Sequence, residues 1–97
     1  MRTTDEYIRL LRAFKDEHGA EYGITRMGIF GSVARGEQTE SSDVDVYYEG
    51  QVIDLLDPRD LHGSLENLLE GRVDLVRRHN YMRPAFLERI MKEIIYV

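Results

Sequence analysis

Two aspartates separated by a single residue are the part of the sequence best suited to chemistry. Asp43 and Asp45 flank Val44 at the start of a β-branched and aromatic segment, which favours a strand. Side chains at positions i and i+2 of a strand point to the same face, so these carboxylates would lie about 6–7 Å apart at Cα. Oxygen ligands alone suit a hard cation such as Mg²⁺ or Mn²⁺. The same pair could form the solvated face of an edge strand, so the motif alone leaves both interpretations open.

A glycine–serine pair after an earlier apolar segment could hold a phosphate group. Gly31 and Ser32 directly follow Phe30, and Arg35 and Gly36 come shortly after them. At a strand-to-helix turn, glycine lets backbone N–H groups approach an anion, and a helix N-terminus adds a partial positive charge. Ser32 would add a hydroxyl donor, and Arg35 a guanidinium suited to phosphate. Both glycine and serine are also common in ordinary turns, which is the alternative interpretation.

A third carboxylate, Asp74, lies within the apolar segment 73–76 (VDLV). An ionised carboxylate in an apolar strand is costly unless it is paired or bound to a metal ion. The alternative to a metal is an ion pair with a neighbouring arginine, which could be Arg72, Arg77 or Arg78. Three carboxylates beside a phosphate-binding turn are typical of sites in which two divalent ions bind a triphosphate and activate a hydroxyl.

Alternating helical and extended patterns would position these residues. The predicted strands are Ile24–Phe30, Val44–Tyr48 and Val73–Val76, and the segment 31–42 is a loop that can include a short helix at its centre. The predicted helices are Thr4–His18, one that begins at Asp57-Pro58 and ends at Gly71, and one that Pro84 opens. Thr3 and Glu6 would form a capping box, and His18 would complete the inward-facing stripe of the first helix. This alternation predicts an α/β (α+β) fold.

Composition narrows the functional classes. The chain has 97 residues, 13 Lys+Arg against 18 Asp+Glu, a net charge of −5 and no cysteine. Its length predicts a single domain over residues 1–97. The acidic balance argues against stable nucleic-acid binding, and the lack of cysteine excludes disulfides and thiolate chemistry. Because no long apolar segment or secretory h-region is present, we expect a cytoplasmic protein that does not span a membrane.

The three motifs together resemble the nucleotidyltransferases of the DNA polymerase β superfamily. They are FGSVARG at 30–36, SDVDV at 42–46 and VDL at 73–75. Ten residues separate Gly31-Ser32 from Asp43, which is the spacing of that family's signature of Gly-Ser, ten residues and Asp-x-Asp. The short chain is most similar to the minimal nucleotidyltransferases (MNT domains), and the resemblance spans essentially its whole length.

The resemblance implies a nucleotidyltransferase fold, in which helices pack on a small mixed sheet of three to four strands. It also implies ATP as substrate and two Mg²⁺ ions as cofactors, for which Mn²⁺ can substitute. The residues implied in metal binding and catalysis are Asp43, Asp45 and Asp74, and those implied in nucleotide binding are Gly31, Ser32 and Arg35.

The same resemblance implies an antitoxin that transfers AMP from ATP to a hydroxyl, typically of a tyrosine, on a partner HEPN-domain RNase toxin. One alternative is an antitoxin that neutralises its toxin by binding without turnover. Another is a transferase acting on a small molecule or an RNA end. The net charge of −5 disfavours RNA and favours a protein partner with a basic face.

Overall fold

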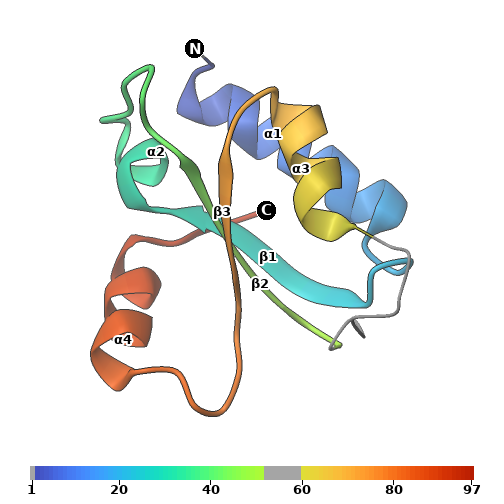
Figure 1. Ribbon diagram of the computed structural model, residues 1–97, viewed down its shortest axis with the longest axis vertical. Coiled ribbons are helices and arrows are strands. Elements are labelled where there is room, and N and C mark those ends of the chain that lie inside the picture. Colours follow the sequence, from blue (N-terminus) through green and yellow to red (C-terminus); the bar gives the residue numbers. More distant parts are fainter. Residues whose placement is uncertain (1, 52–59) are drawn as a thin grey trace.

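A four-stranded mixed sheet in the order β3-β2-β1-β4 forms the centre of the computed structural model, which describes residues 2–51 and 60–97 (Figure 1). Its strands are β1 (Ile24–Phe30), β2 (Val44–Gly50), β3 (Val73–Arg77) and β4 (Ile95–Tyr96). Strand β1 runs antiparallel to both β2 and β4, whereas β2 and β3 are parallel. Since parallel neighbours need a crossover, a helix is expected between β2 and β3, and α3 occupies that place. The predicted α/β fold with a small mixed sheet is confirmed.

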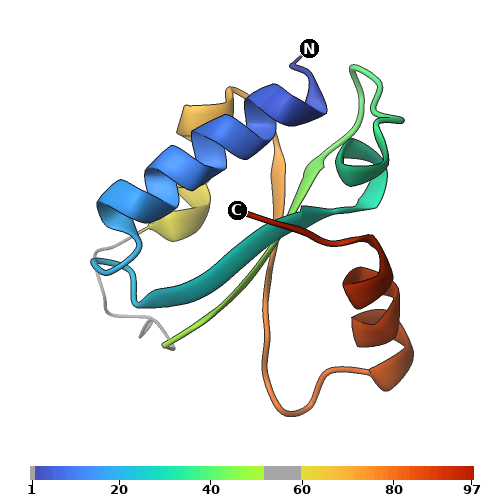
Figure 2. The same ribbon diagram turned by 180° about the vertical axis from the view of Figure 1, so that it is seen from behind.

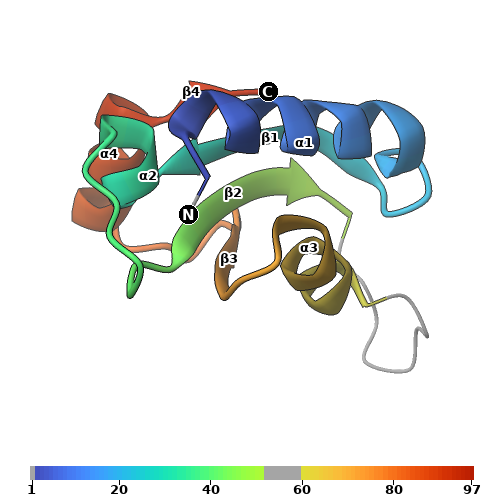
Figure 3. The same cartoon turned by 90° about the horizontal axis from the view of Figure 1, so that it is seen from above.

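The helices of the described residues are α1 (Thr4–His18), α2 (Gly31–Arg35), α3 (Leu61–Leu69) and α4 (Pro84–Glu93). Both α1 and α3 lie on one side of the long strands, and α4 lies on the other side (Figures 1 and 2). Figure 3 shows α2 and α4 together at one end of the molecule. The last helix and the turn after β1 are therefore neighbours, although they are far apart in sequence.

Strand alternation divides the apolar side chains between two cores. The larger core joins the sheet to α1 and α3, and the smaller one, built on Phe30, Tyr47 and Ile90, joins it to α4. Val46 belongs to the larger core and Tyr47 to the smaller one. Because side chains two residues apart share a face, Asp45 lies on the face of Tyr47, next to α4.

The first helix begins as its capping residues predict. The Thr3 hydroxyl accepts a hydrogen bond from the Glu6 N–H at 3.2 Å, and the Glu6 carboxylate accepts one from the Thr3 N–H at 3.1 Å. The expectation that His18 completes the buried stripe is wrong, because its side chain is exposed. Its ring packs at a tilt of 48° against Phe14, with ring centroids 5.3 Å apart, and it contacts Glu21.

Several boundaries differ from the predicted ones. The predicted helix start at Asp57-Pro58 lies outside the described residues. Helix α3 begins at Leu61, where the Asp60 carboxylate accepts a hydrogen bond from the Gly63 N–H at 2.9 Å. The short helix α2 forms at the start of the loop rather than at its centre, directly after β1.

Strand β4 was not among the predicted strands, because two residues carry almost no periodic signal. It pairs with β1 through Gly28 and Ile29. A Cβ atom on Gly28 would lie 2.7 Å from the carbonyl oxygen of Ile95, so glycine is needed for this close approach. The pairing ties the end of the chain to the strand that leads into Gly31.

Candidate active site

The parallel pairing of β2 with β3 brings two of the predicted carboxylates together. Asp45 and Asp74 are register partners, so their side chains leave the sheet on the same face from strands about 5 Å apart. Asp43 lies two residues before Asp45, immediately ahead of β2. The structure therefore places all three predicted aspartates at one end of two neighbouring strands.

Crowding of these carboxylates alters the acidity of Asp45. Burial of its half-buried side chain is the largest cause, and the charges of Asp74 and Asp43 and a hydrogen bond with Asp74 add to it; together they raise the pKa of Asp45 from 3.8 to about 6. Arg89, on α4, acts in the opposite direction. Arg89 therefore offsets only part of the effect of burial and of the neighbouring carboxylates on the pKa of Asp45.

Asp74 does not have the apolar surroundings that its neighbours in the sequence suggested. Its side chain is exposed, whereas Val73, which points to the opposite face of the same strand, is buried. The alternative, an ion pair of Asp74 with a neighbouring arginine, is not among the ion pairs of the described residues, and Arg72 contacts Asp43 instead, with Nε and Oδ1 3.0 Å apart. Asp74 thus faces solvent, whereas Asp45 lies deeper against the turn.

Gly31 connects this carboxylate pair to the glycine–serine turn. Its φ of +71° lies in the left-handed region, which side chains disfavour. A Cβ atom on Gly31 would overlap the Oδ2 atom of Asp45. Glycine is therefore required both by the backbone conformation and by the packing of the Asp45 carboxylate against the turn. The two motifs, separate in sequence, form one site.

Ser32 lies half-buried in the first turn of α2. Its carbonyl oxygen accepts hydrogen bonds from the N–H groups of Gly36 and Glu37, the latter at 2.9 Å. These bonds end the helix after five residues and fix the backbone of Ser32.

Glu93, which the sequence analysis did not single out, accepts hydrogen bonds from the groups that were predicted to bind an anion. One of its carboxylate oxygens accepts a hydrogen bond from the Gly31 N–H at 2.9 Å, and the other accepts one from the Arg35 guanidinium at 2.8 Å. Arg35 also donates to Glu37 at 3.3 Å. The group bonded to this turn is a carboxylate 62 positions away in the sequence, which no local pattern could reveal, and phosphate binding at the turn stays a prediction.

The ligand chemistry of the three aspartates fits the divalent ions that the sequence implies. The donor set is made of oxygen atoms, which Mg²⁺ and Mn²⁺ prefer, and a cation there would offset the repulsion from Asp74 and Asp43 that, after burial, raises the pKa of Asp45. Within residues 2–51 and 60–97, no three acidic, histidine or cysteine side chains already converge as a metal cage. Asp43 is the member of the three that is engaged elsewhere, through its contact with Arg72.

This combination of fold and site defines a nucleotide-transferring enzyme, and comparison with known proteins agrees. Residues 15–97 match the family described as Polymerase beta, Nucleotidyltransferase. The chain therefore belongs to the polymerase β nucleotidyltransferases, and within them it is a minimal nucleotidyltransferase.

Curated relatives match over the full chain. Protein adenylyltransferase MntA of Thermococcus cleftensis is 37% identical, with 100% of this chain and 98% of that protein covered. A Methanocaldococcus jannaschii protein named as a candidate protein adenylyltransferase is 39% identical, with 100% of each chain covered.

Solved structures show the same fold. One described as a candidate minimal nucleotidyltransferase is 37% identical, has a TM-score of 0.70, and covers 91% of this chain and 93% of its own. A toxin–antitoxin crystallised with AMP-PNP is 21% identical, has a TM-score of 0.66, and covers 98% of this chain and 72% of its own. The predicted nucleotidyltransferase fold is confirmed by these likenesses. In the part of the chain that the structure describes, no helix has the length and apolar character to cross a bilayer.

Proposed function

We propose that this protein transfers AMP from ATP to a hydroxyl group of a partner protein. The observation that carries the proposal is the packing of the Asp45 carboxylate against Gly31, with Asp74 as its register partner. That arrangement puts a cation-attracting pair beside a turn that already holds an anion. Full-length similarity to proteins named as protein adenylyltransferases supports the same activity.

Metal binding would fall to the three aspartates. Asp43 and Asp45 would hold two Mg²⁺ ions, or Mn²⁺ in their place, and Asp74 would hold the one nearest the acceptor. When bound, such ions neutralise triphosphate charge and lower the pKa of the attacking hydroxyl. Rotation of Asp43 away from Arg72 is the change in the protein that this binding requires.

The remaining residues would orient the nucleotide and move the proton. Gly31, Ser32 and Arg35 would form the site for the β- and γ-phosphates next to the carboxylates. Gly31, whose own N–H is bonded to Glu93, would give the phosphates room to approach because it has no side chain, and Ser32 and Arg35 would donate hydrogen bonds to them. The acceptor oxygen would form a bond to the α-phosphorus as the bond from that phosphorus to the β-phosphate oxygen breaks. Pyrophosphate then leaves, and the hydroxyl proton passes to an oxygen of Asp74. The exposure of Asp74 at the sheet edge suits this role, because an acceptor can reach it from outside.

The acceptor that we propose is a tyrosine hydroxyl on an RNase toxin of the HEPN type, which this protein would silence as its antitoxin. Toxin–antitoxin structures, including one of an MntA–HpeT mutant, share the fold of this chain. A toxin that binds RNA needs a basic face, and the net charge of −5 on this chain complements it.

Incubation with α-phosphate-labelled ATP and Mg²⁺ tests the proposal when three acceptors are offered in parallel: the co-encoded protein, tRNA and an aminoglycoside. Label on the protein, lost with Asp74→Asn but kept with the exposed control Asp16→Asn, is the expected result. Label on tRNA or on the antibiotic alone would contradict the proposed acceptor. Neutralisation of the toxin without any label would favour an antitoxin that acts by binding only.

A further inference from the structure

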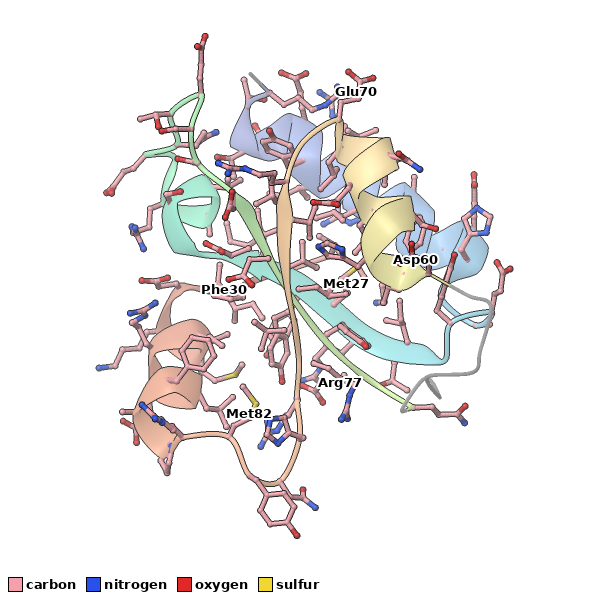
Figure 4. The ribbon with its side chains drawn as sticks, in the orientation of Figure 1. Met27, Phe30, Asp60, Glu70, Arg77 and Met82 are labelled. Atoms are coloured by element: carbon pink, nitrogen blue, oxygen red, sulfur yellow. The ribbon has the colours of Figure 1, made fainter. Side chains whose placement is uncertain are left out.

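Helix α4 ends against the turn that would hold phosphate. Glu93, its last residue, bridges the Gly31 N–H at 2.9 Å and the Arg35 guanidinium at 2.8 Å, using a different carboxylate oxygen for each. Both ribbon views show α4 next to α2 at this point (Figures 1 and 2). Phe30, which directly precedes Gly31, is labelled in Figure 4 and lies at the end of β1 near α4.

The backbone of Glu93 is fixed on both sides. Two residues further along, β4 begins and pairs with Gly28 and Ile29 of β1. Earlier in α4, the Phe86 ring meets the Phe30 ring edge-on, with centroids 6.4 Å apart. Strand pairing and ring packing therefore hold the end of α4 beside the turn, and the hydrogen bonds to Gly31 and Arg35 hold the carboxylate.

Arg35 is oriented by this contact and retains capacity for another anion. Its side chain is 43% exposed, against 20% for Glu93. The bonds to Glu93 and Glu37 use two of the five N–H donors of the guanidinium. The remaining donors can bind phosphate, while the two carboxylates limit the rotation of a side chain that would otherwise be mobile.

We infer that Glu93 is a positioning residue of the nucleotide site: it sets the Gly31 amide and the Arg35 guanidinium in place before the triphosphate binds. This inference rests on the proposed function, because it requires that Arg35 meets phosphate. Glu93 itself touches neither the nucleotide nor the acceptor, and it acts through Arg35.

Isothermal titration of the full chain with ATP and Mg²⁺ tests this role in Glu93→Gln and Glu93→Ala, with Glu88→Gln as the matched control. Glu88 is exposed on the same helix, so that variant removes the same charge without touching the turn. We expect the Kd for ATP to rise about tenfold in Glu93→Gln, further in Glu93→Ala, and less than about twofold in the control. Glutamine can still accept one of the two hydrogen bonds, which explains the expected order.

A second pair of variants separates positioning from a general loss of structure. If Glu93 acts through Arg35, the variant Glu93→Gln should raise the Kd for ATP little further in an Arg35→Ala background. Equal fold-changes in both backgrounds would overturn the inference, as would an unchanged or tighter Kd in Glu93→Gln. A parent protein that fails to bind ATP at all would instead refute the proposed function, so the two failures are distinguishable.

Discussion

Replacement of Asp45 by asparagine should stabilise the protein at neutral pH while it removes the proposed metal ligand. The pKa of Asp45 is raised from 3.8 to about 6, chiefly by burial and then by the charges of Asp74 and Asp43. A group whose pKa is higher in the folded state binds its proton more tightly there. Its contribution therefore favours folding below the unfolded pKa, and that contribution is lost as the pH rises through about 6.

The size of the effect follows from that difference. A shift from 3.8 to about 6 corresponds to an upper limit of about 3 kcal/mol. Because the carboxyl group is partly exposed to solvent, screening reduces this to an expected cost of about 1–2 kcal/mol at pH 7.5. Asparagine carries no charge at either pH, so the variant should be more stable than the parent by about that amount at pH 7.5 and nearly equal to it at pH 4.

Urea unfolding of parent and variant at both pH values, with EDTA present, measures this difference. In the difference between the unfolding free energies of variant and parent, the contributions of groups that titrate far from the site cancel. Addition of Mg²⁺ at pH 7.5 should stabilise the parent and reduce the difference in unfolding free energy between variant and parent. A variant that is destabilised equally at pH 4 and pH 7.5 would refute the reasoning, because its effect would then come from packing and not from charge.

Other changes test the turn and the first helix. Gly31→Ala should lower the free energy of unfolding by about 1–2 kcal/mol in urea, because φ is +71° at this position. It should also abolish transfer in a label-transfer assay, because the added Cβ atom would displace the Asp45 carboxylate. A fully active variant would contradict this packing. Arg35→Ala should weaken ATP binding by about 1.5–3 kcal/mol in isothermal titration, whereas Arg12→Ala on α1 should not, and equal effects would indicate a bulk charge effect. Thr3→Ala should lower stability by about 1 kcal/mol in urea without changing the Kd for ATP, and a changed Kd would show that α1 contributes to the site.

The sequence predicted most of the described elements, and it singled out residues that the structure brings together, because both depend on short-range patterns. The capping box of Thr3 and Glu6, the apolar run ending at Phe30 and the Asp-x-Asp spacing are all readable within a few positions. Strand alternation then places Asp45 on a definite face, and the glycine at position 31 indicates a backbone conformation that other residues avoid.

The sequence could not reveal which strand lies at the sheet edge or which helix end meets the turn. Asp74 has apolar neighbours in the sequence, which suggested burial, yet its side chain is exposed on the face of β3 opposite to that of the buried Val73. Glu93 reaches Gly31 across the fold, close to where β4 pairs with β1, and neither residue carries a local signal for the other. Both features arise from tertiary packing, which periodicity does not encode.

The intact mass of the partner protein after reaction with ATP and Mg²⁺ shows whether this protein transfers AMP to it. We expect a gain of one or more whole AMP units with the parent enzyme and with Glu88→Gln, and no gain with Asp45→Asn or Asp74→Asn. A peptide map should then place the added mass on a tyrosine. A partner whose mass stays unchanged with the parent enzyme, or one that gains AMP equally well with both aspartate variants, would contradict the account.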